Sequence, residues 1–212
     1  MRKSKPIPFK AKPKFAFVVD GDCEFWYIQM LKRNERSISV DLKPEIPQRK
    51  KLSDQYTKVV ELSKDYNKVF WIIDFDVINT ETLKAKKGSK TALQQFKEYF
   101  TEIEKKYTNI QIIINNPCLE YWILLHFEPT SKYFDNCERA TKQLKKYLAD
   151  YDKSQLYYTK QDNDIYLKLK PHLKDAIKNA KKLDAFDFKN PHAGMAEMQL
   201  FFEAEEIKDI LK

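Results

Sequence analysis

The chain has 212 residues and a formal net charge of +8, and 42% of its residues are hydrophobic. This length allows one large domain, or one domain with an appendage, and the composition allows a real core. No stretch approaches the ~20 apolar residues of a membrane span, and no apolar run follows the basic start, which argues against a signal peptide. The positive charge favours an acidic partner, of which nucleic acid is the commonest.

The first segment, residues 1–14, has six basic side chains, three prolines and no acidic residue. A charged terminus of this kind most often stays in solvent. The other interpretation is a basic arm that contacts phosphate groups. We therefore treat residues 1–14 as a basic N-terminal arm outside the core.

Strand and helix patterns alternate between residues 15 and 114. Short apolar runs predict strands buried on both faces, and an alternating stretch predicts a half-buried strand. The predicted strands are residues 15–19, 38–42, 69–73 and 110–114, and the predicted helices are residues 23–33, a helix that opens at Ser53, and residues 89–107. This order predicts an α/β fold with a mainly parallel sheet and helices on both faces.

From about residue 117 the pattern is wholly helical, with an apolar helix followed by amphipathic ones. The expected helices are residues 119–127, 136–149, 162–183 and 194–211. Mobile loops are expected at residues 77–91 and 150–161. We therefore divide the chain into an α/β core, residues 15–127, and a helical C-terminal portion, residues 128–212, which packs on the core.

Each buried strand is followed by acidic or amide side chains. In open α/β sheets ligands bind at the carboxyl ends of the strands, near a topological switch point. These side chains are therefore the first candidates for a functional site. They are Asp20, Asp22 and Glu24 after residues 15–19, Asp74 and Asp76 after residues 69–73, and Asn115, Asn116 and Glu120 after residues 110–114.

Asp74, Phe75 and Asp76 have a spacing suited to metal binding. In an extended chain, residues two apart point to the same side, so both carboxylates would face one point while Phe75 packs the other way. Two carboxylates at one point repel each other unless a cation lies between them. Such hard oxygen ligands suit Mg²⁺ or Mn²⁺. The alternative for each aspartate is helix capping, but a second acidic cluster after a neighbouring strand favours a metal site.

Gly21, between Asp20 and Asp22, is one of three glycines in the chain. So few glycines exclude a phosphate-binding P-loop and a dinucleotide-binding glycine fingerprint. At this position a glycine would permit a tight turn and would let another group approach the backbone.

Glu120 and Asn116 each have two interpretations. Glu120 could reach the same pocket as a further acid, or it could interact with the N-terminus of its own helix, which is the favoured interpretation. Asn116 is expected to cap that helix rather than to contact a substrate.

The three cysteines, Cys23, Cys118 and Cys137, are an odd number at wide spacings. This argues against a disulfide framework and against a zinc site. Cys23 and Cys118 are interpreted as packing residues, because no motif places a histidine beside them. The three histidines show no metal-binding or nucleophile spacing either. A reducing compartment fits best, so a cytoplasmic location is expected.

Two motifs resemble known families. The acid-glycine-acid sequence after the first strand and the Asp-x-Asp at residues 74–76 look like the Toprim domain of primases, topoisomerases and overcoming-lysogenization-defect nucleases. More specifically, residues 115–127, Asn-Asn-Pro-Cys-Leu-Glu-Tyr-Trp-Ile-Leu-Leu-His-Phe, resemble the RloB-like family, found in bacterial defence and restriction–modification neighbourhoods. The C-terminal segments that also fit this family are residues 158–160, 164–166 and 190–191. The resemblance covers nearly the whole chain from Phe15 onward.

The resemblance implies a Toprim-like fold and a divalent-metal-dependent nuclease that acts in bacterial anti-phage defence. Its cofactor would be Mg²⁺ or Mn²⁺, which polarises a phosphodiester and activates water. The implied metal ligands are Asp20, Asp22, Asp74 and Asp76. The implied catalytic residues are Asp20 or Glu24 for proton transfer, and a lysine that offsets developing charge, with Lys160, Lys87 and Lys90 as candidates.

Asp20 departs from the Toprim pattern, in which the first acid is usually glutamate. An aspartate is one methylene shorter, so its reach falls by ~1.5 Å. A misplacement of about 1 Å can cost a factor of ~10² in rate. Asp20 could therefore serve purely as a ligand, with Asp22 or Glu24 transferring the proton.

Substrate and partners are also implied by the resemblance. Related Toprim defence effectors attack cellular RNA, including tRNA, so RNA is slightly favoured over DNA. Such effectors often pair with an ATPase that restrains them until infection is sensed. A homodimer is expected as the commonest assembly.

A second hypothesis is a non-catalytic module that binds nucleic acid or a partner and keeps a vestigial acidic metal site. Asp20 in place of glutamate favours this hypothesis, whereas Asp74 and Asp76 count against it. Primase or topoisomerase chemistry is less favoured, because the sequence has no zinc-ribbon spacing and no tyrosine that can be singled out as a nucleophile.

Overall fold

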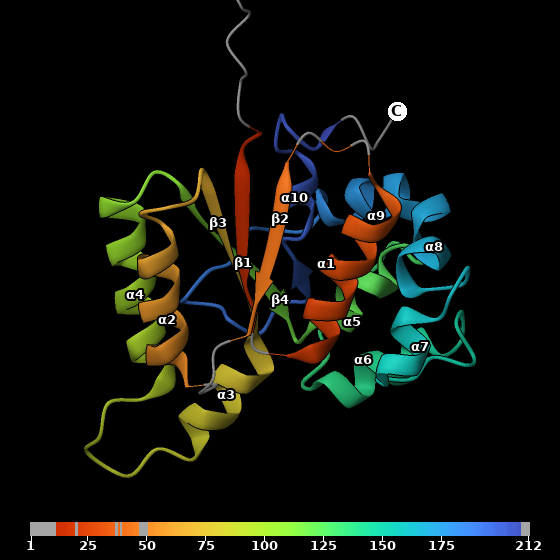
Figure 1. Cartoon of the computed structure of the whole chain (residues 1–212). Helices are drawn as coiled ribbons and strands as arrows, with labels where there is room; N and C mark the ends of the chain where they lie inside the picture. Colours follow the sequence, from red (N-terminus) through yellow and green to blue (C-terminus); the bar gives the residue numbers. More distant parts are fainter. Residues whose placement is uncertain (1–11, 20, 37, 39, 47–50, 209–212) are drawn as a thin grey trace, which may run out of the picture.

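The computed structural model describes residues 12–208 apart from residues 20, 37, 39 and 47–50. Within this part of the chain, helices cover both faces of a five-stranded sheet (Figure 1). Most of the expected basic arm, and also Asp20, lie outside the described residues. None of the described helices combines the length and the apolar composition that crossing a membrane requires.

The sheet is mainly parallel. Its strands are β1 (Lys14–Val18), β2 (Asp41–Glu45), β3 (Lys68–Asp74), β4 (Ile110–Asn116) and β5 (Met195–Ala196). They lie in the order β2-β1-β3-β4-β5. β1 is parallel to β2 and β3, β3 is parallel to β4, and β5 pairs antiparallel with the end of β4. The predicted mixed α/β class with a mainly parallel sheet is confirmed.

Side chains of the strands alternate between two cores, one on each face of the sheet. In β1, Ala16 and Val18 face the core formed with α2 (Leu52–Leu62), α3 (Phe75–Leu83) and α4 (Ala92–Lys106). Phe15 and Phe17 face the opposite core, which α1 (Asp22–Asn34) and the helices after β4 complete. These later helices are α5 (Leu119–Leu124), α6 (Cys137–Leu144), α7 (Gln155–Thr159), α8 (Ile165–Leu169), α9 (Leu173–Ala180) and α10 (Gln199–Phe202). Helices on both faces, as predicted, are visible in Figure 1.

The starts of α4 and α1 follow the rules for helix ends. Before α4, the Thr91 hydroxyl accepts the N–H of Gln94 at 3.2 Å, and Oε1 of Gln94 accepts the N–H of Thr91 at 2.9 Å. This reciprocal pair is a capping box. α1 has two acidic residues in its first turn and two basic residues in its last turn, which suits the helix dipole.

Three segments differ from the sequence prediction. The strand expected at residues 38–42 is shifted to Asp41–Glu45. Residues 77–91 are not a loop throughout, because α3 extends to Leu83. The loop expected at residues 150–161 contains α7. A helix as short as α7 spans too few turns to show a clear apolar period.

The C-terminal portion is not wholly helical, contrary to the sequence prediction. Met195 and Ala196 form β5, and within residues 194–208, the described part of the helix expected at residues 194–211, α10 occupies Gln199–Phe202. A two-residue strand is too short to show an alternating pattern, so periodicity cannot reveal it.

Asn116 holds the segment that precedes β5. Its Nδ2 donates hydrogen bonds to the carbonyl oxygens of Pro191 and Ala193 at 2.7 and 2.8 Å. The prediction that Asn116 caps the next helix is wrong, because the N-cap of α5 is Cys118. The Asn116 side chain instead ties the end of β4 to the C-terminal segment.

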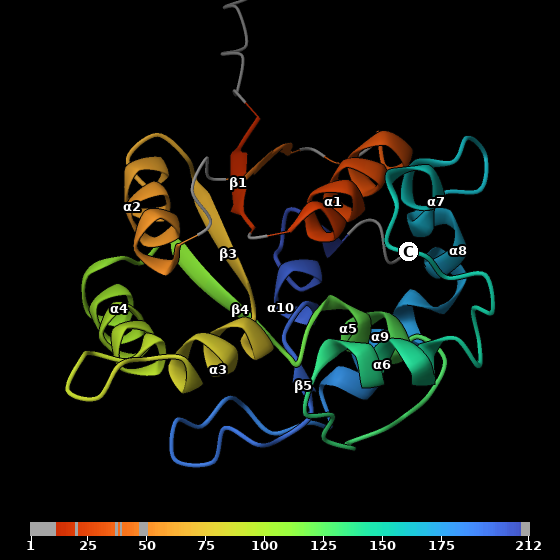
Figure 2. The same cartoon turned by 90° about the horizontal axis from the view of Figure 1, so that it is seen from below.

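The C-terminal portion contributes to both cores. Between α9 and β5, Phe186 and Phe188 reach the α4 face, where their rings lie 6.3 and 5.7 Å from that of Phe96. Figure 2 shows this segment passing beside α3. After β5, Phe201 of α10 returns to the opposite face and packs edge-on against Phe17 at 5.1 Å.

Candidate functional site

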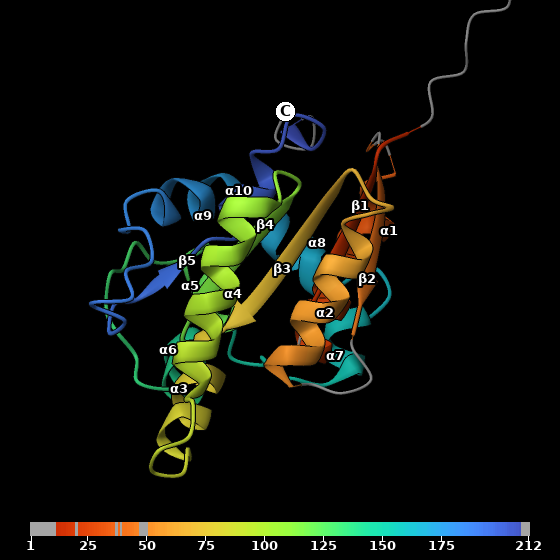
Figure 3. The same ribbon diagram turned by 90° about the vertical axis from the view of Figure 1, so that its left-hand side faces the viewer.

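The topological switch point of the sheet lies between β1 and β3. From β1 the chain continues through α1 to β2, and from β3 it continues through α3 and α4 to β4 on the other side. α1 packs in one core and α4 in the other, so the two connections diverge. In Figure 3 the arrowhead of β3 points toward α3. Asp22 and Glu24 after β1, and Asp74 and Asp76 after β3, therefore flank the crevice in which such sheets bind ligands.

Asp74 and Asp76 are tied to the starts of two neighbouring helices. Asp74 ends β3, and its Oδ1 accepts the N–H of Leu119, the first residue of α5, at 3.0 Å. Asp76 lies in the first turn of α3, and its Oδ2 accepts the N–H of Cys137, the first residue of α6, at 3.1 Å. The extended backbone assumed for residues 74–76 ends at Phe75, where α3 begins. Main-chain donors hold both carboxylates in place.

The carboxyl group of Asp76 has a raised pKa. Burial is the main cause, and the charge of Glu120 adds to it, whereas the N–H of Cys137 and the charge of Lys153 act in the opposite direction. A carboxylate with raised proton affinity beside another acid is stabilised by a cation.

Asn115 lies next to Asp74 at the end of β4. The two residues are in register in the parallel pair, so their side chains leave the same face of the sheet. Asn115 is fully buried, and neither its Nδ2 nor its Oδ1 has a hydrogen-bond partner in the described part of the chain. An orphaned amide oxygen beside a carboxylate is a donor set that fits a hard divalent cation such as Mg²⁺ or Mn²⁺.

Glu120 is buried in the first turn of α5. Its Oε1 accepts the hydroxyl proton of Tyr151 at 2.6 Å and pairs with Nζ of Lys153 at 2.7 Å. The Tyr151 hydroxyl also lies 2.6 Å from that of Tyr158 in α7. These side-chain contacts favour a further acid in the pocket over an interaction with the helix's own terminus.

Lys153 brings positive charge to the acidic side chains. Besides pairing with Glu120, it interacts electrostatically with Asp74 and Asp76. Burial acts to lower the pKa of the Lys153 ammonium, but the charge and hydrogen bond of Glu120 outweigh it, so the pKa is raised. Sequence reasoning missed Lys153, because no motif marks it and it lies in a segment expected to be a loop.

The start of α1 contributes Glu24, which is buried, whereas Asp22 is exposed. A Cβ atom at Gly21 would contact Oε2 of Glu24. The φ of Gly21 is −126°, which other residues also adopt. The backbone at Gly21 is therefore not left-handed, and the Glu24 carboxylate lies against the position that a Cβ atom would occupy. Asp20 lies outside the described residues.

Cys23 lies near the same acids. Burial and the charges of Glu24 and Glu120 raise the pKa of its thiol to about 12. Cys23 therefore stays protonated and is a poor nucleophile at neutral pH.

Lys160 is not brought to this group of residues. Its carbonyl oxygen accepts a hydrogen bond from Nη2 of Arg33 at 3.5 Å. Arg33 follows Asp22 by 11 residues in α1, a distance of roughly 16 Å along a helix. The other two sequence candidates, Lys87 and Lys90, lie in an exposed segment before α4.

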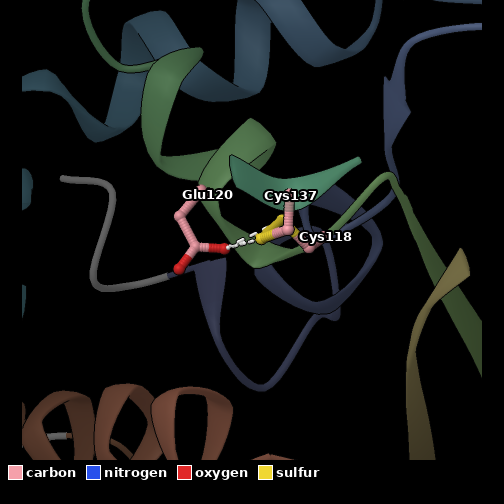
Figure 4. Close-up of side chains that lie close together, drawn as sticks. All are labelled: Cys118, Glu120 and Cys137. Atoms are coloured by element: carbon pink, nitrogen blue, oxygen red, sulfur yellow. Dashed lines mark hydrogen bonds between the residues drawn. A yellow bond between two sulfur atoms is a disulfide. The ribbon is translucent and has the colours of Figure 1, made fainter. Parts of the chain in front are cut away.

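Cys118 and Cys137 form a disulfide, with Cα atoms 5.7 Å apart. The expectation against a disulfide, and with it the interpretation of Cys118 as a packing residue, is wrong. The two cysteines are 19 positions apart in sequence, but packing of α5 against α6 places the starts of both helices side by side. Glu120 lies beside this bond (Figure 4).

Two clefts open at these residues. One, of about 630 Å³, is lined by Asp74 together with Gln55 and Gln95 among others. The other, of about 310 Å³, is lined by Lys153 and Tyr151 among others. A ligand can thus reach Asp74 from the side of α2 and α4, and Lys153 from the side of α6.

The fold and the site define a mixed α/β protein with an acidic, lysine-containing group at the carboxyl edge of a mainly parallel sheet. A model of the RloB-like protein family matches residues 15–204. The chain therefore belongs to the RloB-like family. No curated protein and no solved structure matches the chain.

Proposed function

We propose that the protein is a Toprim-type, divalent-metal-dependent nuclease that cleaves phosphodiester bonds of nucleic acid in bacterial anti-phage defence. The observation that carries the proposal is the arrangement of Asp74, Asp76 and Glu120 around Lys153 at the carboxyl edge of the sheet. Membership of the RloB-like family supports it. RNA such as tRNA is the preferred substrate over DNA. The cytoplasm is the proposed location, in which the Cys118–Cys137 disulfide would be held reduced.

Asp74, Asp76 and the amide oxygen of Asn115 would hold the cation, with Asp20 and Asp22 as further candidate ligands. When bound, Mg²⁺ or Mn²⁺ polarises the phosphodiester and lowers the pKa of water. One oxygen of Asp74 and one of Asp76 already accepts a main-chain N–H. The carboxylates are therefore oriented before a ligand binds, which reduces reorganisation during the reaction.

Lys153 and Glu24 take the remaining roles in this proposal. The Lys153 ammonium offsets negative charge that develops on the phosphate oxygens. The Glu24 carboxylate accepts the proton of the attacking water, a role for which Asp20 is the alternative. Lys160 is left out, since it lies beside the end of α1 remote from the acids.

The net charge of +8 suits a nucleic-acid partner. We further propose a defence-system ATPase that restrains the nuclease, and a homodimer as the assembled form. The first rests on the family resemblance, and the second on the frequency of two-fold assemblies.

The test is a cleavage assay on total RNA, tRNA and plasmid DNA with Mg²⁺, Mn²⁺ or EDTA. We expect metal-dependent cleavage by the wild type and at least about 100-fold less by Asp74→Asn/Asp76→Asn, because the charged ligands are lost. The double variant Asp65→Asn/Asp175→Asn, at exposed positions, removes the same charge elsewhere and should cleave normally. Circular dichroism confirms that each variant folds.

A non-catalytic module that binds nucleic acid is the second candidate. Lys153 favours it, because this residue already neutralises Glu120 and offsets the charge of the aspartates. Such a module would bind RNA without cutting it, and Asp74→Asn/Asp76→Asn would keep or increase the affinity as repulsion from phosphate falls. Calorimetric titration with Mg²⁺ separates the cases. A wild type that binds no metal is a binding module. For one that binds Mg²⁺ without cutting, the RNA affinity of Asp74→Asn/Asp76→Asn decides, because only a binding module keeps or gains affinity when these charges are removed.

A further inference from the structure

A second group of potential metal ligands lies beside the acidic site. Cys118 precedes α5, Cys137 begins α6, and Glu120 lies in the first turn of α5. Oε2 of Glu120 is 2.9 Å from Sγ of Cys118 and 2.8 Å from Sγ of Cys137. These three ligand atoms lie within 4.8 Å of one another. Figure 4 shows the Glu120 carboxylate directed at the two sulfur atoms.

The two oxygens of Glu120 have different surroundings. Oε1 accepts from Tyr151 and pairs with Lys153. Oε2 faces the two sulfurs, and no N–H or O–H group of the described residues donates to it. The sulfurs of a disulfide carry no hydrogen and cannot donate either. A buried carboxylate oxygen without a donor is unfavourable, so this site is better satisfied when the sulfurs are reduced or a cation lies between them.

We propose that Cys118, Cys137 and Oε2 of Glu120 form a binding site for a thiophilic divalent cation such as Zn²⁺, which is available only when the disulfide is reduced. Thiolate sulfur is the ligand that such cations prefer, whereas the carboxylate and amide oxygens of the Asp74 group suit harder ions. Three protein ligands leave a fourth position of the zinc ion for water or another ligand. This proposal stands independently of nuclease activity.

The steps balance in atoms and charge. A dithiol reductant supplies two electrons and two protons, so the S–S bond breaks, two thiols form, and the reductant becomes its own disulfide. Metal binding then releases both thiol protons. Two thiolates and the Glu120 carboxylate carry three negative charges, which the divalent cation and the Lys153 ammonium neutralise.

Lys153 and Tyr151 form contacts that orient the proposed ligand residues. Nζ of Lys153 lies 2.7 Å from Oε1 of Glu120 and 3.1 Å from Sγ of Cys137. The Tyr151 hydroxyl bonds to the same Oε1. Hydrogen bonds to the atoms of a ligand residue that do not face the metal fix the orientation of that residue and strengthen metal binding. Oε2 is thereby left as the oxygen that faces the cation.

The test is a titration of reduced, desalted, metal-free protein with Co²⁺ under anaerobic conditions. We expect one equivalent to bind with a sulfur-to-cobalt charge-transfer band, and Zn²⁺ to displace it. Cys118→Ser and Cys137→Ser should each abolish the band or weaken it strongly, and Glu120→Gln should weaken binding by at least about tenfold. Cys23→Ser, which removes the cysteine outside the disulfide, is the matched control and should keep the band. Oxidised wild type should not bind.

A second measurement covers variants that fail to fold. Reduced wild type is alkylated with and without Zn²⁺, and the modified peptides are identified by mass spectrometry. Protection of Cys118 and Cys137 by stoichiometric Zn²⁺ supports the proposal. Absence of both the cobalt band and zinc protection in folded, reduced protein overturns it, as does a band that survives in Cys118→Ser/Cys137→Ser. These readouts need no nucleic acid, so failure of the nuclease proposal would leave them unaffected.

Discussion

Lys153 illustrates how a single side chain can join separate acidic groups. Replacing it in Lys153→Met would leave Oε1 of Glu120 with Tyr151 as its donor among the described residues. Because the Lys153 side chain is 48% exposed, we expect a loss of roughly 1–2 kcal/mol in the free energy of unfolding, below the range for a fully buried pair. Cleavage should fall by at least about tenfold. Urea unfolding and the RNA assay measure the two effects.

Lys160→Met is the control for this prediction, because Lys160 is exposed and remote from the acids. It should leave the free energy of unfolding and the rate of RNA cleavage nearly unchanged. If Lys160→Met abolished cleavage while Lys153→Met did not, the choice made from the sequence would be the right one.

His126 couples stability to pH. Burial lowers the pKa of its imidazole to about 3, whereas an unfolded chain has a histidine pKa of about 6.5. Between these values the unfolded state binds a proton that the native state does not. The contribution of His126 to the free energy of unfolding is therefore constant above pH ~6.5. On acidification this free energy falls by roughly 1.4 kcal/mol per pH unit, until His126 is protonated in the native state as well.

The variant His126→Phe should flatten this slope between pH 6.5 and 4, measured by urea unfolding at each pH. The exposed His192, changed to Phe, should leave the slope as in the wild type. A wild-type slope equal to that of His126→Phe would show that His126 already titrates normally in the native protein. The comparison concerns slopes, so a change in absolute stability of either variant does not affect it.

Some residues of the site could be predicted from the local sequence, whereas others could not, because tertiary packing places them. Asp74 and Asp76 directly follow an apolar strand, so their place at the end of the sheet could be predicted. Lys153 and Tyr151 reach the site from a connection far along the chain, and only the packing of α6 and α7 against α1 and α5 brings them there. The Cys118–Cys137 bond likewise depends on two helix starts whose proximity is tertiary.

At the scale of elements, the start of α4 offers a clean test of local stabilisation. Thr91→Ala removes the side-chain acceptor of the capping box. We expect a loss of about 1 kcal/mol in the free energy of unfolding. Thr101→Ala, at an exposed position inside the same helix, should change stability by less than about 0.5 kcal/mol. Equal losses for the two variants in urea unfolding would contradict a special role of the cap.

Elements with a clear apolar pattern could be predicted, and elements without one could not. β1, β3, β4, α1 and α4 each have enough apolar positions to show their period. α7 and β5 have too few, and they are positioned by tertiary contacts. For α7 these include Tyr158, buried beside Tyr151, and for β5 they are backbone pairs with β4. The mainly parallel topology could be predicted, because it depends on the order of the long elements.

At the scale of the whole molecule, the C-terminal portion joins the two cores. Phe186 packs on the α4 face and Phe201 on the opposite face, so neither core is complete without this portion. We therefore predict one cooperative unfolding transition. Trp71 belongs to one core and Trp122 to the other, which gives each core its own fluorescent reporter.

Two tryptophan variants test this prediction. Trp71→Phe keeps Trp26 and Trp122, which report on the α1 face, and Trp26→Phe/Trp122→Phe keeps Trp71, which reports on the α4 face. In each variant the urea midpoint from fluorescence should coincide with that from far-ultraviolet circular dichroism. Separate midpoints for the two probes would indicate that the cores unfold independently.

The composition of β2 has a consequence for how copies of this protein can meet. β2 is an outer strand of the sheet, only five residues long, and its sequence is Asp-Leu-Lys-Pro-Glu. Pro44 has no N–H to donate to a neighbouring strand. In the same edge strand, Nζ of Lys43 pairs with Oδ2 of Asp41 at 3.4 Å. Edge strands that are short, charged and contain proline resist pairing with a strand of another chain, and they resist the fibrous aggregation that follows from such pairing. A homodimer would therefore not form through a sheet continued across β2.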